Sequence, residues 1–206
     1  MTAVEEFKES VSRETLQRLE HYVELLLKWN KSINLIASGE QERVWERHIL
    51  DSAQVFNHFP GHSGTWFDFG SGGGLPGIVC ATLSKGAERD IQFHAVESDH
   101  RKAVFLNQVV IALDLSVSVS KSRVEHFSEG IADVISARAL ASLPKLLGLC
   151  RTHMNDQTIL LFPKGRKAES ELTEARESWH MKVHRIQSLT DPDGVILKLT
   201  GVHPRT

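Results

Sequence analysis

The chain has 206 residues, enough for one domain with a substantial hydrophobic core. Its formal net charge of −2 at pH 7 excludes a uniformly basic protein that captures nucleic acid by overall charge, so such contacts require a local patch. The composition, 41% hydrophobic and 24% charged, is that of a soluble globular protein, and no apolar run approaches the roughly 20 residues of a membrane span.

Residues 1–60 have the pattern of a helical extension. Thr2-x-x-Glu5 is a capping box that opens a short helix, and Ser12 is the expected N-cap of a longer helix with an apolar stripe. A third helical stretch is expected over about 41–57, after a break in the pattern. We expect this extension to pack on a second unit, residues 61–206.

From residue 61 the pattern changes to alternating strands and helices. Strands are predicted over 65–69, 91–97, 117–121, 133–137 and 158–163. Helices are predicted between and after them, over 75–83, 100–113, 142–154 and 168–178, with Asp99 as an N-cap. This alternation predicts βαβ units and a mostly parallel sheet.

The chain is expected to end in an antiparallel hairpin. Strands over about 182–188 and 195–200 are separated by Asp191-Pro192-Asp193-Gly194, which is a turn sequence. The predicted fold is therefore α/β, with a mostly parallel seven-stranded sheet that finishes in an antiparallel hairpin.

The segment from Trp66 to Ile78 is the most informative part of the chain. It has a short apolar strand, an acid at Asp68, a turn dense in glycine and the start of a helix. Such a turn lets the backbone approach a ligand closely, because glycine tolerates positive φ and adds no bulk. The carboxylate of Asp68 favours a sulfonium or ammonium ligand over a phosphate.

The same glycines match a second pattern. Gly72-x-Gly74-x-x-Gly77 is a dinucleotide fingerprint, and Glu97 follows about 20 residues later, where a ribose-binding acid is expected. An NAD-dependent dehydrogenase is therefore an alternative, although no His/Asp or Tyr/Lys pair for hydride transfer is evident at the expected edge.

Ligands of doubly wound sheets bind at the carboxyl ends of the central strands. Several polar or glycine-rich segments follow the predicted strands there, namely 70–75, Glu97, 122–125, 136–138 and 164–166. Arg138 stands out among them, because its guanidinium can hold a cofactor, hydrogen-bond a guanine edge or clamp a phosphate.

Together these segments resemble the class I S-adenosylmethionine-dependent methyltransferases, whose first motif is the acid-x-Gly-x-Gly-x-Gly form of residues 68–74. Over the whole chain the sequence is similar to the RsmG (GidB) family of bacterial small-subunit rRNA methyltransferases. The resemblance rests on Lys28-Trp29-Asn30-Lys31-x-x-Asn34-Leu35, Arg47-His48-Ile49-Leu50-Asp51-Ser52, Gly70 to Gly77, Ser122-Arg123-Val124-Glu125 and Ser136-x-Arg138-Ala139.

The resemblance implies a Rossmann-like methyltransferase fold and methyl transfer from S-adenosylmethionine to N7 of a guanine in 16S rRNA, at nucleotide 527. It implies cofactor contacts at positions matching Gly70, Leu75, Val124, Glu125 and Arg138. Asp68, Gly72 and Gly74 of the motif are added as cofactor-binding candidates, and Glu97 as a ribose ligand.

The chemistry is consistent with ring-nitrogen methylation. Guanine N7 has a lone pair and no proton to lose, so no general base is required, and Arg138 is expected to orient the reactants and stabilise charge. Ser136-Ala137-Arg138-Ala139 replaces the Asp/Asn-Pro-Pro-aromatic tetrad of amine methyltransferases, and neither Cys80 nor Cys150 lies where a cytosine C5 nucleophile would be needed.

RNA contacts are expected from both units. Arg101, Lys102, Lys164 and Arg166 are candidates for a phosphate-binding rim, with Arg123 beside them. From the extension we expect Asn34, Arg47, His48 and Asp51 to contact RNA, and Asn34, His48 and Asp51 to line the pocket for the target base. The sequence departs from the family at Gly194 to Leu197, where a basic residue is often found.

We expect the partner to be 16S rRNA presented by the small ribosomal subunit or its assembly intermediate, and the enzyme to be a monomer without membrane contact. A non-catalytic RNA-binding protein with a methyltransferase fold is a further alternative. The two cysteines lie in apolar surroundings, which favours a reduced, cytoplasmic protein. The eleven histidines lack metal-binding spacing, so no metal site is predicted.

Overall fold

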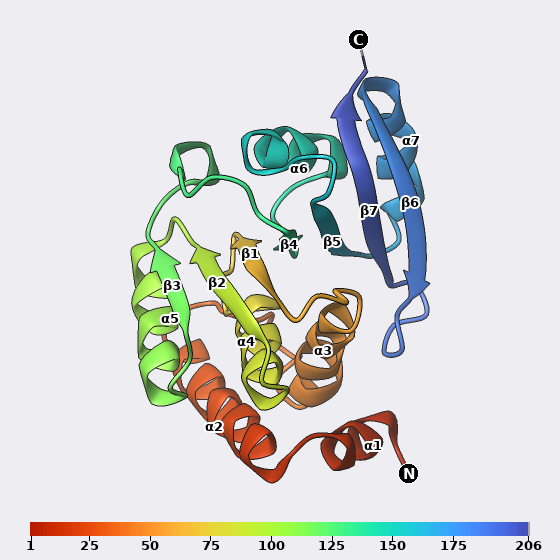
Figure 1. The fold of residues 1–206 in the computed structure, drawn as a ribbon. Coiled ribbons are helices and arrows are strands. Elements are labelled where there is room, and N and C mark those ends of the chain that lie inside the picture. Colours follow the sequence, from red (N-terminus) through yellow and green to blue (C-terminus); the bar gives the residue numbers. More distant parts are fainter. Residues whose placement is uncertain (206) are drawn as a thin grey trace.

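The structure is a computed structural model that describes residues 1–205. Its N-terminal part contains α1 (Ala3–Ser10) and α2 (Arg13–Asn30), drawn red in Figure 1. The predicted caps are confirmed: Thr2 and Glu5 form the capping box of α1, and the Ser12 side chain accepts from Thr15 N in α2. These caps satisfy backbone N–H groups that have no partner within a helix.

The third helical stretch differs from the prediction. Residues 41–43 form a bend and a turn, Trp45–Leu50 forms a π-helical segment, and the α-helix of this stretch is Asp51–Phe56 (α3). A π-helix widens the turn and re-aims side chains, and such segments occur frequently at functional sites. Here it carries Arg47 and His48.

A seven-stranded sheet forms the centre of the molecule, as predicted. Its strands are β1 (Ser63–Phe69), β2 (Asp90–Val96), β3 (Val117–Ser120), β4 (Val134–Ala137), β5 (Ile159–Lys164), β6 (Trp179–Gln187) and β7 (Val195–Pro204). The order is β3-β2-β1-β4-β5-β7-β6, and only the pairs β5–β7 and β6–β7 are antiparallel. The strand order reverses between β1 and β4, which is where a doubly wound sheet binds its ligand.

The remaining helices connect the strands. They are α4 (Gly77–Gly86), α5 (His100–Ala112), α6 (Leu143–Cys150) and α7 (Ala168–Ser178), with 3₁₀ turns at Val124–His126 and Arg151–His153. Asp99 caps α5 as predicted, since its Oδ1 accepts from the amides of Arg101 and Lys102. None of the helices in residues 1–205 has the length and apolar character that crossing a membrane requires.

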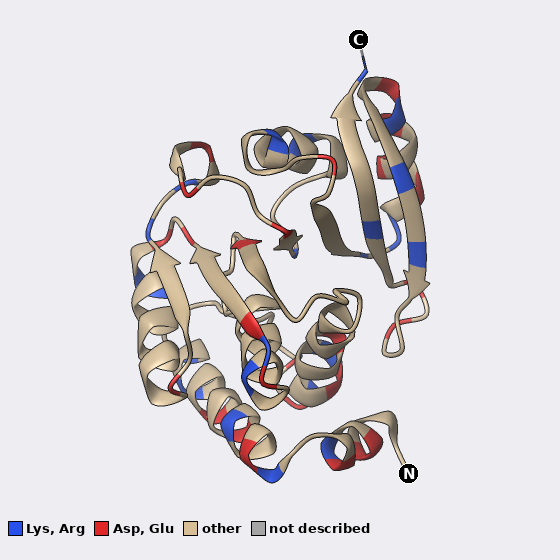
Figure 2. Ribbon diagram, in the orientation of Figure 1, with Lys and Arg blue, Asp and Glu red and all other residues tan. Residues whose placement is uncertain are grey.

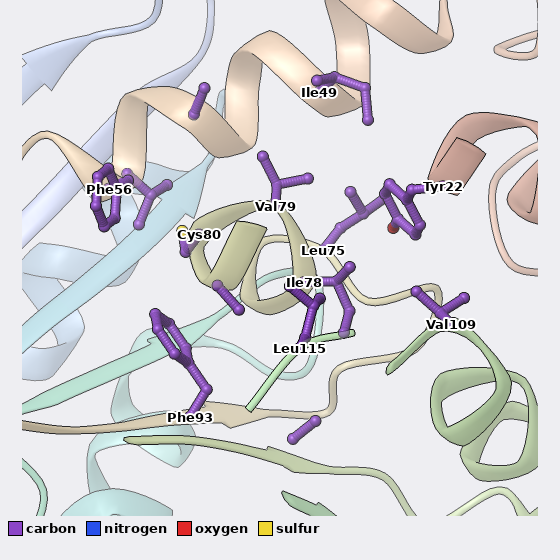
Figure 3. Packing of buried hydrophobic residues seen from close by; sticks show 14 of the residues in the cluster. Tyr22, Ile49, Phe56, Leu75, Ile78, Val79, Cys80, Phe93, Val109 and Leu115 are labelled. Atoms are coloured by element: carbon purple, nitrogen blue, oxygen red, sulfur yellow. The ribbon is translucent and has the colours of Figure 1, made fainter. Parts of the chain in front are cut away.

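Two apolar clusters cover the two faces of the sheet. Side chains alternate between them along β1, where Trp66 joins the first cluster and Phe67 and Phe69 join the second. The first cluster combines residues of α2, α3, α4 and α5, and Figure 3 shows Ile49 and Tyr22 around Val79 of α4. One apolar cluster thus contains side chains from both sides of the predicted boundary at residue 60.

Tyr22 makes the most direct link between the N-terminal helices and the glycine loop. It is fully buried beside Leu75 (Figure 3), and its hydroxyl donates to the backbone oxygen of Gly73 over 2.5 Å. Burial raises the pKa of this phenol far above its usual range, so the hydroxyl stays protonated and can donate.

Replacing Tyr22 by Phe therefore leaves the Gly73 carbonyl without its buried donor. We expect Tyr22→Phe to lower the free energy of unfolding by about 1–2 kcal/mol, measured by urea denaturation. Ser10→Ala is the control, because it removes an exposed hydroxyl that donates to Phe7 O, and its effect should stay within about 0.5 kcal/mol. Equal stability of Tyr22→Phe and the unsubstituted protein would contradict this role.

Candidate functional site

A cavity of about 470 Å³ opens at the carboxyl ends of β1, β2 and β4. We call it the glycine-loop cavity, because residues 70–73 and Leu75 form its floor. Its walls come from Glu97, Ser98 and Lys102 after β2, from Arg138, Ala139 and Leu140 after β4, and from Leu35, Ile36, Ala37, Glu40 and His48 of the N-terminal part. The predicted edge of the sheet is thus where the cavity lies.

The glycine loop is held in place by backbone and carboxylate contacts. Gly70 N and Ser71 N both donate to Val96 O, over 2.9 and 3.1 Å. Gly72 has a φ of +54°, and a Cβ at this position would meet no heavy atom closer than 3.7 Å. The open space beside Gly72 is therefore left for a ligand, and the backbone conformation there is one that other residues rarely adopt.

Glu97 lines the cavity and also fixes its floor. One carboxylate oxygen accepts from Gly72 N over 2.8 Å, and the other accepts from Asp99 N over 2.7 Å. The side chain is buried, but each carboxylate oxygen keeps a further lone pair for a hydroxyl donor. A sugar hydroxyl in the cavity would meet an acceptor that is already held rigidly.

Asp68 lies beneath the loop and not in the cavity, which differs from the prediction that it faces the ligand. Its Oδ1 accepts from Ser136 Oγ over 2.6 Å and its Oδ2 from Gly77 N over 3.3 Å. Burial raises the pKa of Asp68 to about 6, and the hydrogen bond from Ser136 opposes this shift only in part. Asp68 therefore acts on the site by joining the loop and α4 to β4.

Gly74 is required for close packing of the loop against α4, since a Cβ at this position would come within 2.6 Å of the Ile78 side chain. Val124 and Glu125, predicted to contact the cofactor, lie on the 3₁₀ turn after β3, Val124 buried and Glu125 exposed. Neither lines the cavity, although Ser122 N, at the start of this segment, donates to Glu97 O over 3.2 Å.

Arg138 lies where the glycine-loop cavity meets a second cavity. Its Nη2 donates to His48 Nδ1 over 2.9 Å and to Arg47 O over 3.3 Å. Nη1 is buried and has no hydrogen-bond partner among residues 1–205. A buried guanidinium nitrogen without a partner is costly, so an acceptor brought within reach of Nη1 would relieve this cost.

His48 orients this guanidinium in its neutral form. Burial, with the nearby charge of Arg138, lowers the pKa of His48 to about 4. Because arginine offers only donors, Nδ1 must be the acceptor, and the imidazole proton is on Nε2. Glu40 Oε2 lies 3.0 Å from Nε2, outside hydrogen-bonding geometry.

The second cavity has a volume of about 380 Å³, and we call it the hairpin cavity. It lies between the ends of β4 and β5 and the turn that joins β6 to β7, and it is closed on the N-terminal side by Arg47 and Asp51. Arg47 forms an ion pair with Asp191 of that turn over 3.0 Å. Arg138, Ala139 and Leu140 line both cavities.

The wall shared by the two cavities has a strained backbone. Ala139 has a φ of +54°, a conformation that is uncommon for a residue with a Cβ. Such outliers persist where the surrounding structure imposes them, and they are concentrated at ligand sites. The positive φ of Ala139 turns the chain directly after Arg138, and the Arg138 side chain lines both cavities.

The candidate RNA-binding residues do not form one cluster. Asn34, Arg101, Arg123 and Arg166 are exposed, and Lys102 lines the glycine-loop cavity. Arg166 pairs with Asp193 over 2.7 Å. Figure 2 shows both acidic and basic residues on α2 and α7.

Lys164 differs most from the expectation of an open phosphate-binding rim. Its side chain is only 11% exposed, and its ammonium donates to Glu171 and to Ala141 O, each over 2.8 Å. Glu171 in turn accepts from Leu143 N at the start of α6. Lys164 thus holds the loop after β4 and the start of α6, and it lines the hairpin cavity from this fixed position.

Sequence reasoning missed Asn30 as a structural residue of the site. Its Oδ1 accepts from Leu35 N over 2.8 Å and from Ile36 N over 3.0 Å, which fixes the segment that forms one wall of the glycine-loop cavity. Its position at the end of α2, just before the break, is a signal that could have found it, because asparagine often closes turns through its side chain.

Comparison with known protein families shows to which family the chain belongs. The model of the family "GidB: rRNA small subunit methyltransferase G" matches residues 15–197. The chain belongs to this family. A relative named ribosomal RNA small subunit methyltransferase G from Cereibacter sphaeroides is 49% identical over 192 residues, 93% of each chain. One with the same name from Jannaschia sp. is 46% identical over 193 residues, which cover 94% of this chain and 92% of the relative.

Solved structures share the fold at low identity. A ribosomal protein L11 methylase from Lactobacillus delbrueckii subsp. bulgaricus has a TM-score of 0.60 at 15% identity, with 82% of each chain covered. The M1A22 tRNA methyltransferase of B. subtilis has a TM-score of 0.56 at 14% identity, over 73% of this chain and 65% of that one. The predicted Rossmann-like methyltransferase fold is confirmed, and the family membership places the chain among the rRNA methyltransferases.

The buried Asp68 predicts an unusual dependence of stability on pH. Its pKa of about 6 in the folded protein lies above the ordinary 3.8, so its contribution is present below about pH 3.8 and is lost as pH rises through 6. We expect the free energy of unfolding of Asp68→Asn, relative to that of the unsubstituted protein, to rise by on the order of 2 kcal/mol between pH 4 and 8. Urea denaturation at several pH values measures it, and a difference that falls or stays constant over this range would contradict the assignment.

Proposed function

We propose that this protein transfers the methyl group of S-adenosylmethionine to N7 of a guanine in 16S rRNA. The observation that carries the proposal is the pair of cavities that meet at Arg138, one floored by the glycine loop and the other open beside the hairpin. Two reactants in these cavities would meet at their shared wall, and the membership in the rRNA methyltransferase family supports this arrangement.

The residues of the glycine-loop cavity fit the proposed donor. Gly72 leaves room for close backbone approach, and Glu97 offers acceptor oxygens for ribose hydroxyls. Leu75 and Ile36 give the cavity apolar surface against which an adenine can pack. When bound, S-adenosylmethionine would supply an electrophilic methyl carbon for the lone pair of N7, with neutral S-adenosylhomocysteine as the leaving group.

The hairpin cavity is the proposed site of the target base. No side chain needs to remove a proton, because N7 has none, so these residues act by holding the base in register with the donor. A guanine must leave its stacked position to enter such a cavity, as base-modifying enzymes generally require.

Arg138 is proposed to orient the reactants from the wall between the cavities. His48 Nδ1 and Arg47 O both accept from Nη2 and so fix the guanidinium, and we propose that the buried Nη1, which has no partner among residues 1–205, donates to a reactant once the site is occupied. A group fixed before the reaction does not need to reorganise during it, and this preorganisation is the main source of catalysis in such sites.

We propose that the base is presented by the small ribosomal subunit or an assembly intermediate, because the net charge of −2 gives no general attraction for naked RNA. A cytoplasmic location and action as a monomer are part of this proposal. Subunits purified from cells that lack the protein should accept a methyl group from radiolabelled donor, and mass spectrometry of rRNA fragments should place 7-methylguanosine at one site.

Two results of this experiment would overturn the proposal. If protein-free rRNA is methylated as fast as subunits, the ribosomal particle is not the required substrate. If rRNA from cells that lack the protein keeps all its 7-methylguanosine, the protein does not catalyse the proposed reaction. Calorimetry with S-adenosylhomocysteine and with NADH separates the methyltransferase from the alternative dehydrogenase, since a methyltransferase should bind S-adenosylhomocysteine in the glycine-loop cavity and should not bind NADH there.

The role of Arg138 predicts the effect of a conservative substitution. Arg138→Lys keeps a positive charge but replaces the rigid planar fork of guanidinium by a flexible point charge, so His48 and a reactant are no longer held in one fixed geometry. We expect kcat to fall about 100-fold on small subunits. Arg13→Lys, at an exposed position on α2, is the matched control and should retain full activity. A drop of less than about threefold for Arg138→Lys would contradict the proposed role.

A further inference from the structure

Asp51 has an anchored half and an open half. It is the first residue of α3 and lines the hairpin cavity. Its Oδ1 accepts from Gln54 Nε2 over 3.2 Å, from Ser188 Oγ over 3.0 Å and from the Thr190 hydroxyl. No hydrogen bond or ion pair among residues 1–205 reaches Oδ2.

The anchored half accounts for the position of the carboxylate. Ser188 and Thr190 belong to the segment that follows β6, and Gln54 also accepts from Leu189 N over 2.9 Å. One carboxylate oxygen with three donors uses its full capacity as an acceptor, so the group cannot rotate without losing these bonds. Oδ2 is consequently held at a fixed place in the cavity wall.

The open half has the chemistry of a guanine reader. Guanine presents two neighbouring and nearly parallel donors on its Watson–Crick edge, N1–H and one N2–H, whereas adenine presents the acceptor N1 and no donor at C2. An anionic oxygen that faces this edge accepts from guanine and repels adenine. The opposite edge of the base, with N7, can then face the glycine-loop cavity through the wall formed by Arg138.

We propose that Asp51 Oδ2 accepts hydrogen bonds from N1–H and N2–H of the target guanine and thereby selects guanine for methylation. This inference rests on the proposed function. The contact also strengthens during the reaction: as the N7–carbon bond forms and the carbon–sulfur bond breaks, positive charge moves from sulfur to the purine, and its N–H groups become stronger donors. An acceptor that binds the transition state better than the substrate raises kcat as well as selectivity.

The first test needs no variant. Small subunits reconstituted with guanine, inosine or adenine at the target position are methylated by the unsubstituted protein, and kcat/KM is measured for each. Inosine keeps N7 and N1–H but lacks the N2 amine, so we expect about 10-fold lower kcat/KM, and adenine should be lower by 100-fold or more. Equal kcat/KM for guanine and inosine would overturn the inference.

The second test changes the acceptor itself. In Asp51→Asn the amide oxygen can keep the donors of Gln54, Ser188 and Thr190, so the amide nitrogen takes the place of Oδ2 and presents a donor to the base. We expect kcat/KM on guanine to fall about 10- to 100-fold, and the preference for guanine over adenine to fall to less than about 10-fold. Asp156→Asn, in the exposed turn before β5, removes the same charge and should change neither value.

The controls separate this inference from the proposed function. Failure of the unsubstituted protein to methylate guanine subunits rejects the function itself. Guanine methylation by Asp51→Asn within twofold of the unsubstituted rate, with unchanged preference over adenine, rejects only the reading of the base by Asp51. Calorimetry with S-adenosylhomocysteine and thermal unfolding show whether Asp51→Asn keeps its fold. If the variant does not fold, the ratio of kcat/KM for guanine to kcat/KM for inosine, measured with the unsubstituted protein, tests the inference.

Discussion

The contact between Arg138 and His48 is the constraint on which the site depends. It joins the end of β4 to the π-helical segment of the N-terminal part, and it does so with a guanidinium that donates to a neutral imidazole. Both groups are largely removed from water, so each requires the other as a partner. The contact links the N-terminal part to the end of β4, at a residue that lines both cavities.

Three carboxylates around the sheet edge have different tasks because their surroundings differ. Asp68 is enclosed and accepts from Ser136 and Gly77, so it is part of the framework. Glu97 accepts backbone donors and still borders the glycine-loop cavity. Asp51 uses Oδ1 to accept three internal hydrogen bonds, while Oδ2 has no internal donor among residues 1–205 and the residue lines the hairpin cavity. The residue type is similar in each case, and what differs is whether the carboxylate borders a cavity and how much acceptor capacity its internal donors leave.

Much of the fold could be predicted from the sequence, because the signals are local. The capping side chains of Thr2, Ser12 and Asp99 accept from backbone amides two or three residues away, and the alternation of strands and helices is visible in windows of a few residues. The edge at which the glycine-loop cavity lies could be predicted for the same reason, since the order of strands and loops follows from the βαβ pattern. The π-helix was not predicted, because its hydrophobic spacing does not separate it from an α-helix.

The roles of single side chains were harder to predict, because they depend on partners far away in the sequence. Asp68 is separated from Ser136 by 68 positions, and only the pairing of β1 with β4 brings the two together. Lys164 has the appearance of a surface cation in the sequence, but the fold places Glu171 and Ala141 O around its ammonium. The turn at Ser188 and Thr190 closes on Asp51 across more than 130 positions, and no local pattern indicates this.

The wall that Asn30 holds has a consequence for how this architecture can vary. Residues 35–37 form one wall of the glycine-loop cavity, and Tyr22 supports its floor, so the N-terminal part is a component of this cavity. A shortened chain that starts at β1 would keep every strand of the sheet and still lack one wall of the glycine-loop cavity. An unrelated leading segment would have to supply an equivalent wall before this cavity could form again.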